Sequence, residues 1–271
     1  MKPEPISLAE YRDAFEAARM RAERAALACV REPTPDAIHE ARISVRKVMA
    51  ALSLLPRRPR NTETTLKAKK RLRVFYKACA KIRDIDAITG ALSGENPGPG
   101  LDGILRNLES ERAALLASAV KSAKKVPGLR LRAPDGDTRI RLRKRLNKLL
   151  TERAGRAAQL QQTAAKGEKR VAELHRLRKE CRRIKYLLDF AVEDEMVDSA
   201  QDTLERAREK LGSIRNDDLL MEALKGAKGR RCAELAEAVA AARSARFREF
   251  FLPTQRPGGG KRLASLLRGL A

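Results

Sequence analysis

Hydrophobic residues along this chain recur at spacings of three and four positions, the period of an α-helix with one buried face. The clearest example is the segment LHRLRKECRRIKYLLDF, whose predicted apolar stripe comprises Leu174, Leu177, Cys181, Ile184 and Leu188. No stretch shows the sustained alternation of polar and apolar residues that is typical of a half-buried β-strand. The pattern therefore predicts an all-α fold.

Helix start and stop signals divide the chain into two successive groups of helices. Ser7 and Glu10 have the spacing of a capping box, and Thr34 followed by Pro35 predicts a second helix start. Prolines and glycines mark the expected turns. The predicted helices cover approximately residues 8–30, 35–55, 62–89, 101–125, 138–165, 168–192, 199–211 and 216–250, the last with a break near residues 226–229.

We interpret residues 1–271 as a single domain made of two four-helix bundle halves. The first half is expected over residues 6–125 and the second over residues 138–251. The intervening segment, residues 126–137 (VPGLRLRAPDGD), contains prolines and glycines and is the expected linker. A run of glycines then separates a short basic tail, placed at residues 252–271.

The charge of the chain is strongly positive, with a formal net charge of +24 and a pI of about 10.5. An excess of this size repels itself in the folded state, so it favours a polyanionic partner. Aromatic residues make up only 3% of the chain. The core must therefore be built mainly from Leu, Ala, Val and Ile.

Cysteine usage and hydropathy indicate where the protein resides. Cys29, Cys79, Cys181 and Cys232 are widely spaced, without the paired spacing of a metal site, so we expect reduced core thiols and no metal. Neither a signal peptide nor a membrane-spanning segment is apparent. The expected location is the cytoplasm, with no membrane partner.

The chain looks internally duplicated. IHEARISVRKVMAALSLL, residues 38–55, aligns without a gap on LHRLRKECRRIKYLLDFA, residues 174–191. A second pair of similar segments follows, KIRDIDAI at residues 81–88 and SIRNDDLL at residues 213–220. The first alignment matches His39, Arg42, Arg46 and Lys47 with His175, Arg178, Arg182 and Arg183.

These matched basic positions are the candidate anion-binding residues. Like charges spaced four residues apart destabilise a helix by roughly 0.2 to 0.5 kcal/mol per pair, and a bound anion would remove that cost. Each histidine either donates to a phosphate oxygen or is a structural residue at the edge of the core. Lys185 is an additional candidate in the second copy. On the third helix, a basic row that could equally be a solvated face comprises Lys70, Lys77 and Lys81.

The motif HxxRxxxR[KR] near the start of the second and sixth helices, followed each time by R-[DN]-x-D at the end of the next helix, resembles the CHAD domain, the conserved histidine α-helical domain. This resemblance spans approximately residues 6–251. It implies two four-helix bundles related by a pseudo-twofold axis, with a basic surface between them. It also implies binding of inorganic polyphosphate without catalysis. Granule association, polyphosphate chain-length preference and oligomeric state are left open.

The first copy departs from the family pattern R-R-L-R, because it reads Arg46-Lys47-Val48-Met49 and so lacks the fourth basic position. This half is expected to bind more weakly. The chain has no ExExK motif of the triphosphatase domains that often accompany this family, and no GxSxG or Walker-type loop. We therefore expect no enzymatic activity and no cofactor.

Two other functions compete with polyphosphate binding. The first is nonspecific binding of RNA or DNA, because net charge alone does not separate one polyanion from another. The second is an enzyme that acts on polyphosphate, although no cluster of carboxylates stands out that would hold Mg²⁺. Arg83 and Arg215 also occupy matched positions, but each neighbours acidic residues and could belong to a structural ion pair.

Overall fold

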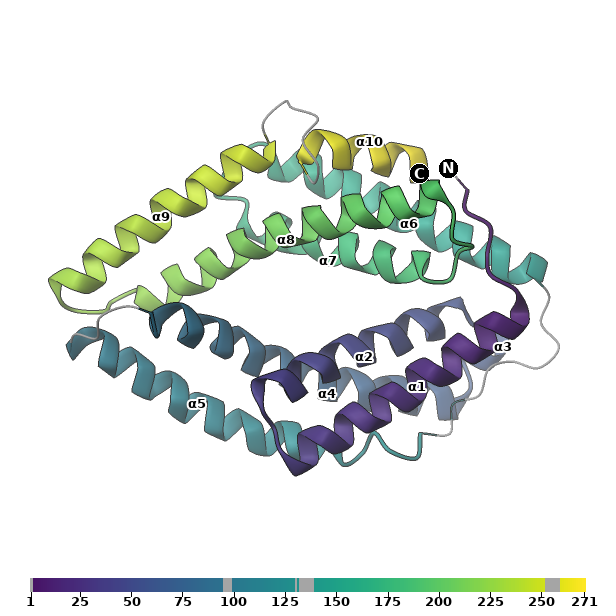
Figure 1. Cartoon of the computed structure of the whole chain (residues 1–271), viewed down its shortest axis with the longest axis horizontal. Helices are drawn as coiled ribbons and strands as arrows, with labels where there is room; N and C mark the ends of the chain where they lie inside the picture. The colour runs from purple at the N-terminus through teal and green to yellow at the C-terminus, as the bar shows by residue number, and fades with distance from the viewer. Residues whose placement is uncertain (1, 95–98, 130, 132–138, 252–258) are drawn as a thin grey trace. The chain divides into compact units, whose positions relative to one another are not determined.

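The computed structural model describes residues 2–94, 99–129, 131, 139–251 and 259–271, and within these residues it is all-α with one isolated β-bridge. Figure 1 shows the helices in chain order. The chain separates into two compact units. Residues 7–142 form the N-terminal unit, and residues 1–6 together with 143–271 form the C-terminal unit. Each unit is described by itself.

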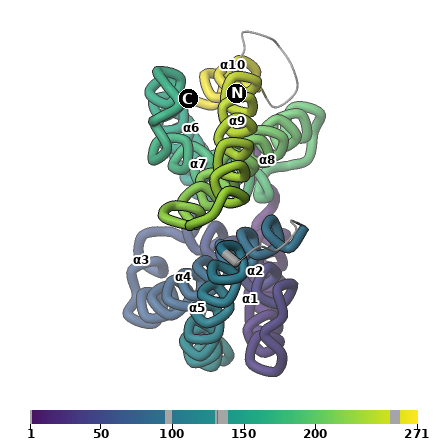
Figure 2. Tube along the Cα trace, turned by 90° about the vertical axis from the view of Figure 1, so that its left-hand side faces the viewer, coloured from purple at the N-terminus to yellow at the C-terminus, as the bar shows by residue number. Residues whose placement is uncertain are grey.

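The N-terminal unit is a bundle in which α1 packs against α2, α2 against α4, α4 against α5, and α5 against α1 (Figures 1 and 2). A four-residue helix, α3, connects α2 to α4. Large side chains such as Tyr11, Phe15 and Phe75 fill the core. The helices of this unit are α1 (Leu8–Arg31), α2 (Pro35–Leu54), α3 (Arg57–Arg60), α4 (Glu63–Leu92) and α5 (Pro99–Ala123).

In the C-terminal unit, α7 packs against α8 and α8 against α9, while α10 lies against both α8 and α9 (Figure 2). The N-terminal strand-like segment joins this unit, because the Ile6 amide donates to the Phe190 carbonyl at 3.1 Å and the Val192 amide to the Glu4 carbonyl at 2.8 Å. The helices of this unit are α6 (Arg139–Ala164), which begins just before the unit boundary, α7 (Val171–Leu188), α8 (Glu195–Leu224), α9 (Arg230–Phe251) and α10 (Gly260–Leu270).

Two predicted helix starts are confirmed. The Ser7 hydroxyl accepts from the Glu10 amide at 3.2 Å while the Glu10 carboxylate accepts from the Ser7 amide at 2.7 Å, which completes the capping box of α1. The Thr34 hydroxyl accepts from the Ala37 amide at 3.2 Å, with Pro35 in the first turn of α2. Local sequence alone is sufficient to place these helix ends.

Three segments differ from the prediction. Helix α4 runs through Gly90, and α8 is continuous through Gly212, where a break was expected. Residues 252–271 were assigned to a basic tail, but the described part of this segment, residues 259–271, includes α10, whose Leu263, Leu267 and Leu270 are buried against the rest of the unit. The predicted linker lies mostly outside the described residues, although Leu129 and Leu131 within it are buried.

Candidate anion-binding surfaces

Helix α7 positions the basic residues of the C-terminal unit. The predicted apolar stripe is confirmed, because Leu174, Leu177, Cys181, Ile184 and Leu188 are all buried. Burial of this stripe fixes the rotation of the helix, so the neighbouring stripe lies at the edge of the core. Its side chains, His175, Arg178 and Arg182, are all half-buried.

His175 lies in a cationic environment formed by two helices. Burial lowers the pKa of its ring to about 4, together with the charges of Lys179, Arg215, Arg178 and Arg182. Arg215 belongs to α8, and the other three belong to α7. Within the described part of the chain, no group hydrogen-bonds the buried Nδ1 of His175. The ring is therefore neutral at pH 7, and cations surround it.

Gly212 gives the Arg178 guanidinium its place against α8. A Cβ atom added at this buried glycine would lie 3.5 Å from both Nε and Nη2 of Arg178. A glycine inside a helix costs roughly 0.5 to 1 kcal/mol relative to alanine, because it loses more conformational freedom on folding. The packing of α8 against α7 offsets that cost, which explains why α8 continues through a residue that sequence reasoning treated as a break.

His39 occupies the matched position on α2 but is exposed. Partial burial of the ring lowers its pKa, together with the charges of Arg83, Arg42 and Arg46, while the charge of Glu40 raises it. Glu40 is itself bound by Arg21 at 2.6 Å. The N-terminal surface is therefore cationic too, but a carboxylate on the same helix opposes it.

Tyr76 of α4 orients two arginines of this surface, a role that sequence reasoning missed. The Arg46 guanidinium carbon lies 5.2 Å from the centroid of the Tyr76 ring, and Arg46 Nη2 donates to the Tyr76 hydroxyl at 3.3 Å. Burial and the charge of Arg46 lower the pKa of Arg42, whereas Tyr76 and Asp84 oppose that shift. A tyrosine within a basic helix was the available signal in the sequence.

Arg83 and Arg215, which the sequence placed among possible ion pairs, also act on the histidines. Their charges lower the pKa of His39 and His175, respectively. The last aspartate of each R-[DN]-x-D motif makes the ion pair with the following helix. Asp86 binds Arg112 of α5 at 2.7 Å, and Asp218 binds Arg243 of α9 at 2.6 Å. Both arginines therefore belong in the candidate sites.

The remaining predicted residues lie in different environments. Arg183 forms an ion pair with the buried Glu180, on the side of α7 that faces α6. Lys185 binds Glu205 of α8 at 2.7 Å, and Arg208 shares that carboxylate. Lys47 is half-buried near Glu40, whereas the three lysines of the predicted row on α4 are all exposed: Lys70, Lys77 and Lys81.

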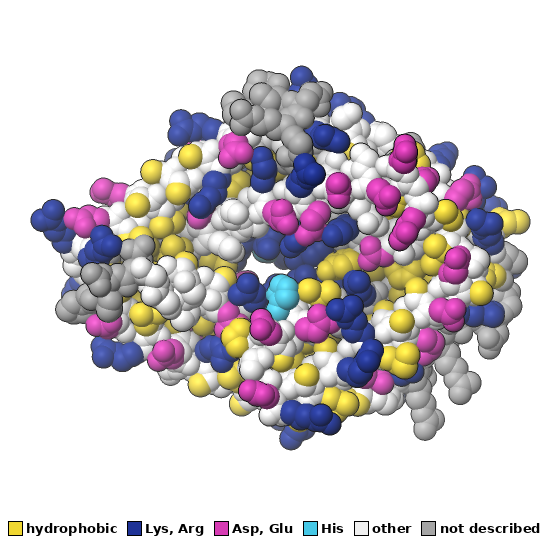
Figure 3. All heavy atoms as spheres, viewed as in Figure 1, with side chains coloured by type: hydrophobic (Ala, Val, Ile, Leu, Met, Phe, Trp, Pro, Cys, Tyr) yellow, Lys and Arg dark blue, Asp and Glu magenta, His cyan; other side chains and the backbone are white. Residues whose placement is uncertain are grey.

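Figure 3 shows one face of the molecule, on which Lys and Arg side chains occur on both units, interspersed with Asp and Glu. In the described residues, no group of three or more His, Cys, Asp or Glu side chains is placed to hold a metal ion. Within the same residues, no helix is both long and apolar enough to cross a membrane.

The fold and these residues define a class of protein, an all-α protein in which each of the two units carries a histidine among arginines. Comparison with protein families then shows that the sequence model of the CHAD domain matches residues 9–225. The chain therefore belongs to the CHAD domain family. No curated protein sequence matches the chain.

The fold is also similar to a solved structure, described as the crystal structure of the CHAD domain from the plant Ricinus communis. The TM-score is 0.65 at 18% sequence identity, and the match covers 99% of this chain and 94% of that one. At this identity the similarity establishes the fold alone.

Proposed function

We propose that this protein binds inorganic polyphosphate, without catalysing a reaction, through the basic surfaces around His39 and His175. The observation that supports this most strongly is the convergence of Arg178, Arg182 and Arg215 from two helices on His175. Guanidinium groups bind phosphate oxygens through forked hydrogen bonds, and a polyanion would neutralise charges that otherwise repel one another.

The aromatic residues favour polyphosphate over nucleic acid. The chain has six phenylalanines and three tyrosines, and none of them is exposed. Proteins that bind single-stranded nucleic acid usually stack bases on exposed aromatic side chains, worth about 1 to 3 kcal/mol per base. Polyphosphate has no bases, so a surface of arginines and lysines without stacking platforms matches its chemistry.

Each histidine is proposed to act as a proton-coupled donor. In the ligand-free protein the His175 ring is neutral, because burial and the surrounding cations keep its pKa at about 4. A bound polyanion offsets those cations and raises the pKa, so the ring takes up a proton and donates to a phosphate oxygen.

A competition experiment tests the proposal against its main rival. Fluorescently labelled polyphosphate of defined length is bound to the protein at fixed salt and challenged with short duplex DNA at equal charge concentration. We expect unlabelled polyphosphate to displace the label and DNA to leave it bound. Displacement by DNA at equal charge would instead support nonspecific nucleic-acid binding.

Incubation with long-chain polyphosphate and Mg²⁺ tests the non-catalytic part of the proposal. We expect no release of orthophosphate above the level seen without protein, and protein-dependent release would establish an enzyme.

The proposed location is the cytoplasm, because all four cysteines are buried free thiols. Co-sedimentation with polyphosphate granules would measure granule association.

A further inference from the structure

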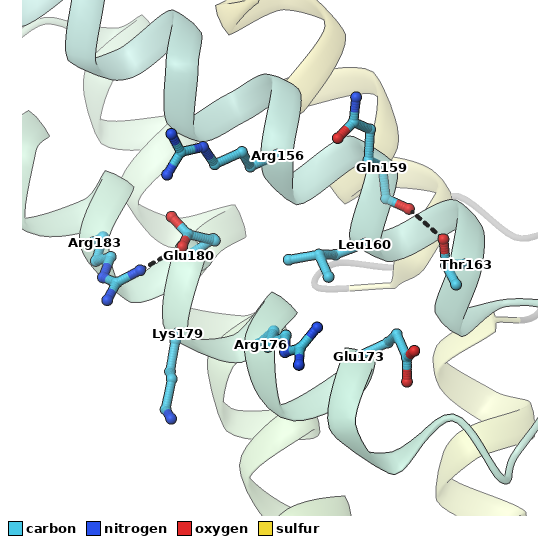
Figure 4. Close-up of a pocket in the computed structure, with 9 residues that line it drawn as sticks. All are labelled: Arg156, Gln159, Leu160, Thr163, Glu173, Arg176, Lys179, Glu180 and Arg183. Carbon is cyan, nitrogen blue, oxygen red and sulfur yellow. Dashed lines mark hydrogen bonds and ion pairs between the residues drawn. The ribbon is translucent and has the colours of Figure 1, made fainter.

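A second cationic feature lies between α6 and α7, on the side of α7 that bears Arg183. An open pocket of about 610 Å³ separates the two helices there (Figure 4). This volume falls within the usual range for small-molecule sites, roughly 300 to 1,000 Å³. The lining residues are Arg156, Gln159, Leu160 and Thr163 of α6, and Glu173, Arg176, Lys179, Glu180 and Arg183 of α7.

The buried carboxylate at this pocket is already neutralised. Arg153 Nη1 donates to Glu180 at 3.1 Å, and Arg183 forms an ion pair with the same carboxylate. Two guanidinium groups therefore share one negative charge. Glu180 consequently does not offset the other cations of the pocket, and the Arg183 nitrogens that face away from it remain able to bind a ligand.

Arg156 and Arg176 stand on opposite walls of the pocket, with Leu160 between them (Figure 4). In the part of the chain that the structure describes, neither arginine forms an ion pair or a side-chain hydrogen bond. Glu173 is the opposing carboxylate, and it lies at the end of the pocket near Thr163 (Figure 4). Arg176 lies beside Glu173, whereas Arg156, Lys179 and Arg183 lie towards the other end (Figure 4).

We propose that this pocket is a separate binding site for a short oligophosphate group, either free or carried by a nucleotide. Arg156 and Arg176 would bind the phosphate oxygens from opposite sides, and Lys179 and Arg183 would add charge at the rim. The site goes beyond the proposed function, because Arg156 and Arg176 are not part of the surface around His175, although the charge of Lys179 acts on both.

Calorimetric titration of the full chain with tripolyphosphate tests this site. Arg156→Ala/Arg176→Ala should weaken binding about tenfold for each arginine, because a charge-assisted hydrogen bond contributes roughly 1.5 to 3 kcal/mol and 1.4 kcal/mol is a factor of ten. The charge-matched control is Arg24→Ala/Arg31→Ala, which removes two exposed arginines of α1. This control should leave the tripolyphosphate affinity unchanged.

Glu173→Gln provides a test that loss of folding cannot imitate. Removing the opposing carboxylate should strengthen tripolyphosphate binding severalfold, because a like charge no longer faces the ligand. No gain in this variant would overturn the site, as would tripolyphosphate binding that survives Arg156→Ala/Arg176→Ala unchanged.

Two further experiments distinguish a nucleotide from free oligophosphate as the ligand, and the pocket from the surface around His175. ATP binding with tripolyphosphate-like affinity assigns the site to nucleotides as well, ATP exclusion assigns it to free oligophosphate, and binding of neither overturns it. Arg178→Ala/Arg182→Ala should weaken long-chain polyphosphate binding and leave tripolyphosphate binding intact. If long-chain polyphosphate does not bind the surface around His175, the proposed function is wrong. The tripolyphosphate titration still tests the pocket independently.

Discussion

The two histidine surfaces carry the same motif in different electrostatic settings. His175 is half-buried among cations that lower its pKa, whereas His39 is exposed and Glu40 opposes the three arginines around it. In the C-terminal unit, Arg178 is packed against Gly212, while in the N-terminal unit Tyr76 holds Arg46. Burial and neighbouring charges, rather than the motif alone, therefore set how strongly each surface should attract an anion.

Helices α4 and α8 carry different charges at positions that align with one another. Both contain 30 residues, and an end-to-end alignment places Arg83 on Arg215 and Asp86 on Asp218. The same alignment places Lys70 on Asp202 and Lys77 on Glu209. The exposed lysine row is therefore particular to the N-terminal unit, whereas α8 carries acidic residues at two of the matched positions and Ser213 at the third.

The largest expected difference between the units concerns their motif aspartates. Asp218→Ala should reduce the free energy of unfolding by about 3 to 5 kcal/mol, because it leaves the nearly buried Arg243, 8% exposed, without its closest carboxylate. Asp86→Ala should cost less, because Arg112 is 25% exposed and water can solvate it. Urea unfolding of both variants measures the difference, and equal losses would contradict this view of the two ion pairs.

The next largest effect should appear in polyphosphate binding. Arg178→Ala/Arg182→Ala should weaken affinity on the order of a hundredfold, and Arg42→Ala/Arg46→Ala should weaken it less, because Glu40 already offsets that surface. The slope of log affinity against log salt should fall by roughly one for each lost phosphate contact. A larger loss from the N-terminal pair would reverse the ranking of the two surfaces.

A smaller effect should appear in the pH dependence of binding. Because a bound polyanion raises the pKa of His175 above its ligand-free value of about 4, binding takes up a proton. Affinity for polyphosphate should therefore increase as the pH falls from 7 towards 5, by up to about tenfold per pH unit. His175→Gln should remove most of this dependence and His39→Gln less of it. Equal pH dependence in wild type and His175→Gln would show that the ring does not titrate on binding.

Gly212 provides the smallest effect. Gly212→Ala should raise the free energy of unfolding by roughly 0.5 to 1 kcal/mol, because its Cβ would make ordinary van der Waals contact with Arg178 at 3.5 Å while the helix gains propensity. Gly212→Leu should displace the guanidinium and weaken polyphosphate binding severalfold. Unchanged binding in Gly212→Leu would mean that the position of Arg178 does not matter.

Local signals in the sequence predicted the helical class, the caps at Ser7 and Thr34, and the buried stripe of α7. They did not predict that α10 packs, since its three buried leucines follow a glycine-rich segment in a short helix. They also treated Gly212 as a break, because the guanidinium that packs against it comes from another helix.

The candidate site was predictable as a set of basic positions but not as a set of contacts. Lys185 and Arg183 looked equivalent to Arg182 in the sequence, yet they bind Glu205 and Glu180. Arg83 and Arg215 looked like structural residues because acids follow them, and the structure shows that their charges also lower the pKa values of the histidines. Partner choice between distant helices depends on how those helices pack, and the sequence pattern does not encode this directly.

The most direct test of the central claim is the pKa of His175, measured by NMR with and without polyphosphate. The chain has only two histidines, so His39→Gln assigns both sets of imidazole signals. We expect the ligand-free pKa of His175 to be about 4 and to rise by more than one unit at saturating polyphosphate, with a smaller change at His39. A His175 pKa that stays the same while calorimetry shows polyphosphate binding would contradict the account, because the polyanion would then be bound away from this surface.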